Sequence, residues 1–419
     1  MNRYRSSTPV LAALLLTAPA FADEVRKPAG IVLPGTDTQL KLYGFVQVFA
    51  QYYFNQFLYD NGTLIGGSSN PLNANSTPDK QFTMTPRSSR FGFRSATPSA
   101  QLGEVITNVE MDFASGDPHP RGNLKLRQAW IGVRDWTVGY TWSNWIDLDA
   151  APETVDLSGP IGQTGNDTGR YTQIRYAWRL TPRTGLAFSV EQNQMAYPGR
   201  WGAATNPNTQ DPSGSYASTI QPDAKYPSLV GALTHTGTWG GHVGLRVLQQ
   251  NYGAYQPGTD AVGGSRPNRW AGAVQVSGNV PFGKDNFVYS IYTGQGVGAY
   301  GFSPQAAKFN MTNGTVDFYT STGWQAGYTH TWTDKLRSNL IVTGLQFKNA
   351  ALVEPTDIKG SMNYFVNGIL KLSKYFEVGL EYAYEDLKTF GPNAVVQRGG
   401  GLGDSNHSSK LQLALTAKF

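Results

Sequence analysis

Five basic side chains recur at alternating positions in three short segments of the sequence. They are Arg90 and Arg94, Lys125 and Arg127, and Arg175. If each segment is a β-strand, residues two or four apart point to the same face, so these side chains gather on one surface. Like charges on neighbouring strands repel, and that repulsion is tolerable only in water and near acids. Such a surface attracts anions, because each guanidinium group offers a planar pair of donors to a carboxylate.

Two acids, Glu110 and Asp112, fall on the same face. One interpretation is that the basic residues only neutralise these and other acids. The other is that they select anions. The two interpretations are compatible, and the sequence leaves both open.

Residues suited to catalysis are sparse. Of five histidines, only His407 has suggestive neighbours, namely Asp404, Ser405 and Ser408, and a polar segment rich in Gly and Ser produces these by chance. The chain has no cysteine, which excludes disulfides and thiolate metal sites. We therefore expect no enzymatic activity, no catalytic residue, no metal site and no cofactor. An outer-membrane barrel hydrolase is the less favoured alternative.

The C-terminal residues alternate strictly between apolar and polar. Phe419, Leu415, Leu413 and Leu411 share one parity, while Gln412 falls on the other. A strand with one face in lipid and the other in a wet lumen needs this pattern. The terminal aromatic also matches the signal that the barrel-assembly machinery reads in outer-membrane barrels.

Similar stretches of about ten residues occur along the whole chain, separated in turn by short and long polar segments. They predict an all-β fold, a transmembrane antiparallel β-barrel of about 16 strands that is wide enough for water. The first strand begins near Thr38, and the others are expected near residues 81–95, 105–113, 124–133, 136–143, 170–180, 185–194, 226–236, 240–251, 269–278, 287–296, 316–331, 336–347, 361–372, 376–387 and 409–419.

The N-terminal residues predict export. Arg3 and Arg5 precede a short apolar run, and a small-residue cleavage site follows at residues 20–22. We expect a signal peptide at residues 1–22 cleaved after Ala22, a short periplasmic segment at residues 23–37, and an outer-membrane barrel at residues 38–419.

Composition agrees with this class. Beyond the signal no apolar stretch reaches the roughly 18 residues of a spanning helix, and the mean hydropathy is −0.35. Removing residues 1–22 leaves 32 basic and 29 acidic residues, a net charge of +3. This mild excess does not indicate nucleic-acid binding.

The segment between Trp142 and Arg170 is acidic and has no Lys or Arg within it. Its apolar residues, which include Trp145, are out of place on an exposed loop. We expect the loop to fold into the barrel, bury them against the wall and narrow the pore. The alternative is a loop packed over the barrel mouth or against a neighbouring subunit. The acids expected at the constriction are Asp147, Asp149, Glu153 and Asp156.

Several motifs resemble the DcaP-like porin family of Gram-negative outer membranes. They are PGTDTQLKLYGFVQ (34–47), SRFGF (89–93), VEMDF (109–113), LRQAWIGV (126–133), GYTWSNWIDLDAAPETVDLSGPIG (139–162) and RYTQIRYAW (170–178). Beyond residue 178 the likeness is one of architecture only.

This resemblance implies a homotrimer of sixteen-stranded barrels in the outer membrane, in contact with lipopolysaccharide, which passes small anionic solutes such as dicarboxylates or aromatic carboxylates. A non-selective diffusion porin is the alternative. Family members often carry His-Ala-Tyr where this chain has Gln128, Ala129 and Trp130. Simple alternation places Gln128 and Trp130 on the outer face, so we expect this difference to leave the pore unchanged.

Overall fold

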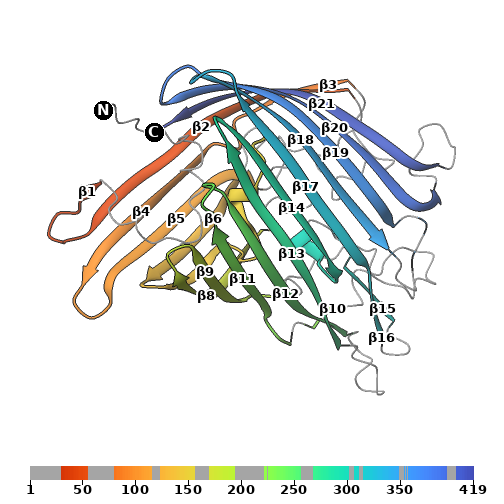
Figure 1. The fold of residues 1–419 in the computed structure, drawn as a ribbon, viewed down its shortest axis with the longest axis horizontal. Helices are drawn as coiled ribbons and strands as arrows, with labels where there is room; N and C mark the ends of the chain where they lie inside the picture. The colour runs from red at the N-terminus through yellow and green to blue at the C-terminus, as the bar shows by residue number, and fades with distance from the viewer. Residues whose placement is uncertain are drawn as a thin grey trace.

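Sixteen antiparallel strands close into a barrel (Figure 1). The computed structural model describes residues 30–54, 80–115, 123–155, 169–193, 221–223, 225–255, 268–301, 306–310, 315–348, 353, 355, 357–393 and 403–419. The wall consists of β2 (Gln39–Tyr53), β4 (Arg90–Ser99), β5 (Gly103–Ser115), β6 (Asn123–Val133), β7 (Trp136–Trp142), β8 (Arg170–Thr181), β9 (Thr184–Glu191), β11 (Ser228–Thr236), β12 (His242–Tyr255), β13 (Asn268–Phe282), β14 (Asp285–Gln295), β17 (Thr320–Thr331), β18 (Leu336–Lys348), β19 (Ile358–Lys371), β20 (Phe376–Asn393) and β21 (Gly403–Lys418). The predicted fold class is confirmed.

Shorter elements accompany the wall. β1 (Ile31–Val32) pairs with the start of β2, and β10 (Gln221–Pro222) pairs with the end of β12. β3 (Gln81–Thr85) and β4 both pair with β2, so the strand predicted at residues 81–95 has two parts. The described residues also include two 3-10 helices, η1 (Leu148–Ala150) and η6 (Gly298–Gly301).

The first and last strands of the wall close the barrel. β2 pairs with β21 from Phe45–Lys418 to Tyr53–Lys410. Phe419 extends this seam, because its N–H donates to the carbonyl oxygen of Gly44 at 3.0 Å and its carbonyl accepts from the Gly44 N–H at 3.3 Å. These contacts leave no open edge between the two ends of the sheet.

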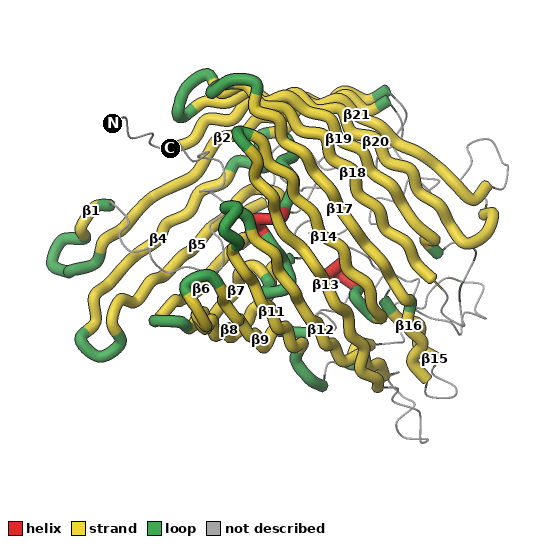
Figure 2. The backbone as a smooth tube through the Cα atoms, in the orientation of Figure 1, coloured by secondary structure: helices red, strands yellow, loops and turns green. Residues whose placement is uncertain are grey.

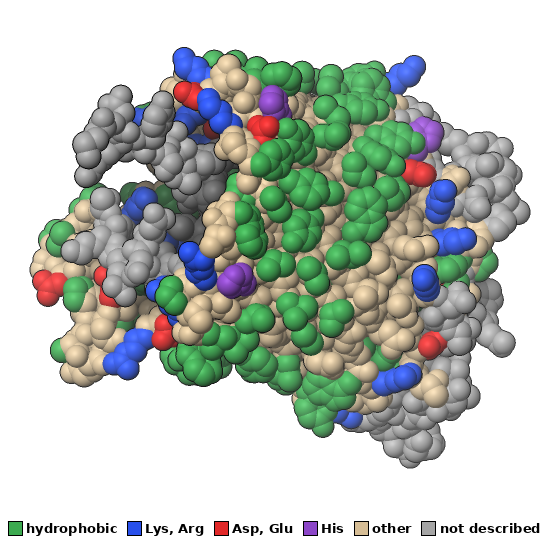
Figure 3. Space-filling model, viewed as in Figure 1, with side chains coloured by type: hydrophobic (Ala, Val, Ile, Leu, Met, Phe, Trp, Pro, Cys, Tyr) green, Lys and Arg blue, Asp and Glu red, His purple; other side chains and the backbone are tan. Residues whose placement is uncertain are grey.

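Alternation decides which face of each strand meets lipid. Leu411, Leu413 and Leu415 of β21 are 37–40% exposed, while Gln412 and Ala414 between them are buried toward the lumen. Hydrophobic side chains cover much of the outer wall in Figure 3. The predicted alternation of the closing strand is confirmed.

Short turns connect strands at one rim of the barrel, and Figure 2 draws them in green. They include residues 100–102, 134–135, 182–183, 283–284 and 372–375. The C-terminus lies at this rim, because the Lys418 N–H donates to the carbonyl oxygen of Tyr375 at 2.7 Å.

One predicted strand begins too early. Residues 315–318 belong to β16 (Thr315–Phe318), which pairs with β15 (Ala307–Asn310) in a separate hairpin, and the wall strand β17 begins at Thr320. The reason is that Phe318 and Tyr319 are both buried, which breaks the alternation that a wall strand requires.

No helix in the described part of the chain is long and apolar enough to span a membrane. The predicted signal peptide, residues 1–22, lies outside the described residues.

Candidate functional site

Residues 143–155, the described part of the acidic segment, form a loop inside the barrel, which we call the constriction loop after its predicted role. Near its start the Asn144 N–H donates to the Glu191 carboxylate of β9 at 3.0 Å. Near its end the Val155 N–H donates to the Glu381 carboxylate of β20 at 2.9 Å. Both carboxylates are buried on the lumen face of their strands. The constriction loop therefore follows the inner wall from β9 to β20, and its predicted inward folding is confirmed.

Apolar residues of the constriction loop pack against the wall. Trp145 is fully buried, and its ring meets the edge of Tyr292 with centroids 6.2 Å apart. Ile146 and Leu148 join the same cluster. Burying an aromatic side chain of this size is a large apolar stabilisation, which explains why an otherwise polar loop leaves the solvent.

The acids of the constriction loop bind the wall beneath it. Asp147 Oδ2 lies 3.0 Å from Arg246 Nη1 and 2.8 Å from His242 Nε2 of β12, and it accepts a hydrogen bond of 2.6 Å from Ser277 of β13. Burial alone would raise the pKa of Asp147, but Arg246 and His242 outweigh burial, so the pKa falls below its usual range.

The pKa of Asp149 is shifted in the opposite direction from that of Asp147. Burial, and after it the negative charge of Asp147, raise the pKa of Asp149 above its usual value. The two neighbouring carboxyl groups therefore differ in acidity because only Asp147 is paired with a cation.

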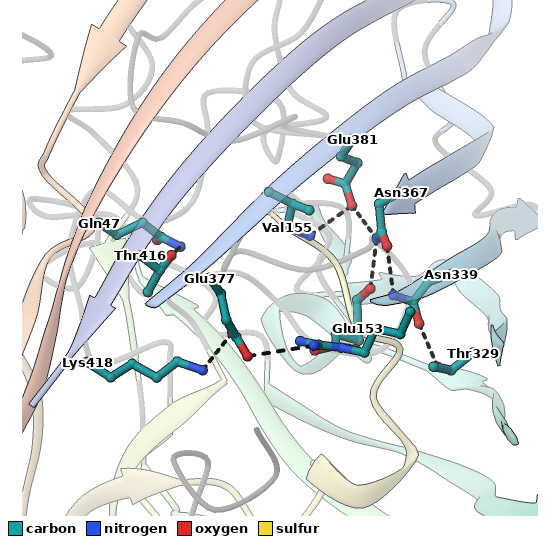
Figure 4. A network of polar contacts seen from close by, with 11 residues as sticks. Gln47, Glu153, Val155, Thr329, Asn339, Asn367, Glu377, Glu381, Thr416 and Lys418 are labelled. Atoms are coloured by element: carbon teal, nitrogen blue, oxygen red, sulfur yellow. Dashed lines mark hydrogen bonds and ion pairs between the residues drawn. The ribbon is translucent and has the colours of Figure 1, made fainter. Parts of the chain in front are cut away.

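Glu153 anchors the far part of the constriction loop. Arg337 of β18 donates to it from Nε at 2.8 Å and from Nη2 at 2.7 Å. Arg337 also lies 3.6 Å from Glu377, which in turn pairs with Lys418 at 2.7 Å. Figure 4 shows this network joining Glu153 to the strands that close the barrel. Asp156 lies outside the described residues.

The basic residues on the opposite part of the sheet are partly neutralised. Arg90 Nη1 lies 3.3 Å from Glu110 and its Nη2 lies 3.4 Å from Asp112. Arg127 pairs with the same Asp112 oxygen. The structure therefore brings together Arg90, Arg127 and the two predicted lumen acids, as the neutralising interpretation requires.

Arg94 has no such carboxylate partner among the described residues. Its Nε donates to the Asn108 side-chain oxygen at 3.3 Å, and its guanidinium carbon lies 5.4 Å from the ring centroid of Trp130. A guanidinium held by an amide and an aromatic face stays charged without a direct ion pair, although the nearby Glu110 carboxylate also acts on it electrostatically. Arg94 is therefore distinct from its two ion-paired neighbours.

The remaining two predicted basic residues are Lys125 and Arg175. Lys125 stands opposite Asp112 in the β5–β6 register. Arg175 lies on β8, beyond β7, and donates to the carbonyl oxygen of Trp142 at 3.5 Å. We call the predicted row of Arg90, Arg94, Lys125, Arg127 and Arg175 the basic ladder. It extends from β4 to β6, and Arg175 marks a separate position near the start of the constriction loop.

A β-bulge corrects the prediction for Gln128 and Trp130. In β6 the register shifts at Arg127, so that Gln128 stands opposite Glu110 and Trp130 opposite Asn108. Both partners face the lumen, and Trp130 contacts the lumenal Arg94. The expected outward orientation was wrong because one extra residue in a strand reverses the parity of all residues after it.

The position opposite Trp130 is a glycine, on β7. Gly139 has a φ of +130°, and a Cβ there would lie 2.7 Å from the Cα of Trp130. The close approach of the two strands beside the bulge therefore requires glycine.

Sequence reasoning missed four basic residues around the constriction loop. Arg170 is buried, with its guanidinium carbon 3.6 Å from the ring centroid of Trp142, and Arg246, His242 and Arg337 hold the loop acids. Arg246 and Arg337 could have been found from the alternation of their strands. Nothing in the local sequence indicates which acid each one binds.

His407 is the histidine that has Asp404, Ser405 and Ser408 close by in the sequence. His407 stacks on Tyr384 with ring centroids 5.9 Å apart and stands opposite Asp386. Within the described ranges no group of three His, Asp or Glu residues is arranged to hold a metal ion.

The family model described as DcaP outer membrane protein matches residues 25–208, which include the bulged strand, the ladder and the constriction loop. This part of the chain resembles the DcaP outer membrane proteins. The resemblance read from the sequence is confirmed over these residues, and the location that it supports is the outer membrane of a Gram-negative bacterium. No curated protein matches the sequence significantly.

Solved structures show the same fold. The outer membrane channel DcaP of Acinetobacter baumannii is 21% identical, with a TM-score of 0.74 over 94% of this chain and 100% of that chain. An anion-selective porin from Comamonas acidovorans is 12% identical, with a TM-score of 0.56 over 91% and 100%. The trimer form of OmpT of Vibrio cholerae is 13% identical, with a TM-score of 0.55 over 91% and 99%. The DcaP-like chain thus has the fold of outer-membrane channels and porins.

Proposed function

We propose that this protein is a porin for passive diffusion of small anionic solutes, dicarboxylates and aromatic carboxylates among them. The observation that carries the proposal is the division of charges inside the barrel. Asp147 and Glu153 bind Arg246 and Arg337 on the wall beneath the constriction loop. These two loop acids are therefore engaged away from Arg94, whose guanidinium forms no ion pair with a carboxylate within the described residues.

A positive wall of this kind favours the passage of anions, because an anion can both enter and leave. An entering anion exchanges part of its hydration for charge-assisted hydrogen bonds to guanidinium groups. Nearby acids such as Glu110 and Asp112 weaken the binding, so that the solute also leaves. A dianion of succinate or phthalate size gains two such contacts, whereas a neutral sugar gains none. The flux needs no energy source and no enzymatic step.

Reversal potentials of the reconstituted channel in a salt gradient test ion preference directly. We expect a potential of the sign that anion permeation sets. Liposome swelling then compares a dicarboxylate with a neutral sugar of matched size, and the dicarboxylate should enter faster. Equal entry of the two solutes and a reversal potential near zero would leave a general diffusion porin.

We also infer a homotrimer, which the trimer form of the outer membrane protein OmpT supports. Chemical cross-linking of the protein in outer-membrane vesicles should give a band at three times the subunit mass, and a band for the monomer alone would contradict the inference. Phe419 is 63% exposed at the closing seam, which suits its proposed recognition by the barrel-assembly machinery. Lipopolysaccharide is the expected lipid partner of the outer wall.

A further inference from the structure

A second segment folds into the barrel beside the constriction loop. Residues 296–301 follow β14 and contain η6. Gln250 of β12 donates from Nε2 to the carbonyl oxygens of Gly296 at 2.9 Å and Val297 at 3.1 Å. Gly296 has a φ of +58°, and a Cβ there would lie 2.6 Å from the Cβ of Ala271. The turn is therefore held on the lumen face of the wall and requires glycine at its first position.

Tyr300, the third residue of η6, reaches across the lumen. Its side chain is fully buried, and its hydroxyl donates to Glu191 Oε2 at 2.9 Å. Its ring stacks on Tyr171 of β8, with centroids 4.4 Å apart and planes 13° from parallel. Because β11, β12 and β13 separate β14 from β9 in the sheet, this contact passes through the lumen and not along the wall.

Glu191 joins the two inward segments. Its Oε1 accepts hydrogen bonds from the Asn144 N–H at 3.0 Å and from the Ser189 hydroxyl at 2.7 Å, while Oε2 accepts the Tyr300 hydroxyl. Asn144 itself donates from Nδ2 to the carbonyl oxygen of Ala187 at 3.1 Å. Next to it, Trp145 enters the apolar cluster that also contains Val297 and Tyr300. Glu191 is thus the point at which the second segment and the start of the constriction loop meet.

A buried carboxylate keeps its orientation only while both oxygens have donors. Without the Tyr300 hydroxyl, Oε2 of Glu191 loses its hydrogen-bond donor among the described residues, and the carboxylate is free to rotate away from Asn144. We propose that Tyr300 is a positioning residue for the constriction loop, acting through Glu191. The proposal rests on the channel fold and not on anion selectivity, so either can fail without the other.

Single-channel recording of Tyr300→Phe tests this role, because the substitution removes the hydroxyl and keeps the stacked ring. We expect at least a twofold increase in open-channel noise, with added conductance levels. Tyr53→Phe is the matched control, since Tyr53 is also buried and its hydroxyl donates to the side-chain oxygen of Gln51 on the wall at 3.0 Å. It should record like the wild type. Heat-modified mobility of the barrel on gels should be unchanged in both variants.

Thiol labelling gives a second measurement, because the chain has no cysteine. Ala151→Cys on the constriction loop should react at least twofold faster with a water-soluble reagent when combined with Tyr300→Phe than alone. Glu191→Gln should raise the same rate, which keeps the test available if Tyr300→Phe fails to assemble. Unchanged noise in assembled Tyr300→Phe channels, or unchanged labelling with Glu191→Gln, would overturn the proposal.

Discussion

Arg337 and Glu153 form a two-pronged ion pair across 184 residues of sequence, with Nε 2.8 Å from Oε2 and Nη2 2.7 Å from Oε1. This geometry matches the fork of a guanidinium to both oxygens of a carboxylate. The pair holds the constriction loop against β18, while Asp147 and Arg246 hold it against β12. The loop is thus fixed at two separate points, and at each point an acid of the loop pairs with an arginine of the wall.

Removing the Arg337–Glu153 pair should loosen the loop. Hydrogen bonds to charged groups contribute about 1.5–3 kcal/mol, so Arg337→Ala should populate detached loop conformations and raise the mean single-channel conductance. Lys284→Ala is a suitable control, because it removes the largely exposed ion pair between Lys284 and Asp334 at the rim. A conductance trace of Arg337→Ala that matches the control and the wild type would show that the pair does not position the loop.

Substitutions in the basic ladder should shift ion preference toward cations. Arg94→Ala removes a positive charge that forms no direct ion pair among the described residues, whereas Arg127→Ala also leaves Asp112 with one cation fewer. Each variant removes positive charge from the lumen, so we expect both shifts in reversal potential to have the same sign. The shifts should fade at 1 M salt, where the Debye length is about 3 Å. If both single variants and the double variant keep the wild-type preference, the ladder does not set selectivity.

The acidity of Asp147 predicts how the loop responds to pH. An acid with a lowered pKa in the folded state stabilises it above its ordinary pKa of about 4, and this stabilisation is lost as the pH falls through the folded value. Conductance should therefore stay constant from pH 7 to about pH 4 and change only in stronger acid. At pH 7, Asp147→Asn should already show the changed conductance that the wild type shows only in strong acid.

Asp149→Asn provides the comparison for this pH experiment. The pKa of Asp149 is raised, so protonation is favoured in the folded state and its neutral substitute should disturb the loop less than Asp147→Asn does. A conductance step of the wild type between pH 7 and pH 5 that Asp147→Asn abolishes would contradict the assignment.

The bulge in β6 predicts which side chains meet water. Gln128→Cys and Trp130→Cys should each react with a charged, membrane-impermeant thiol reagent, and modification should reduce the current. Ile131→Cys is the control, because Ile131 is 50% exposed on the outer wall and should be shielded by lipid. Labelling at Ile131 without labelling at Trp130 would show that inward and outward side chains alternate along β6 without a bulge.

Local patterns of the sequence determined the wall of this barrel. Alternation of the kind seen at Leu411 to Leu415 requires only that neighbouring side chains face opposite environments, so it located sixteen wall strands and showed that Arg90 and Arg94 share a face. Trp145 on an acidic loop likewise indicated inward folding, because an aromatic residue of that size needs an apolar surface.

Tertiary structure alone decided the details of the constriction. The bulge at Arg127 turns Trp130 into the lumen, and period-two alternation carries no information about where an extra residue will be inserted. The partners of Asp147 and Glu153 are also set by the fold, since Arg246 and Arg337 reach them only after the sheet has closed. Any lumenal arginine is chemically suited to a loop carboxylate, and only the curvature and register of the barrel select which one lies within hydrogen-bond distance.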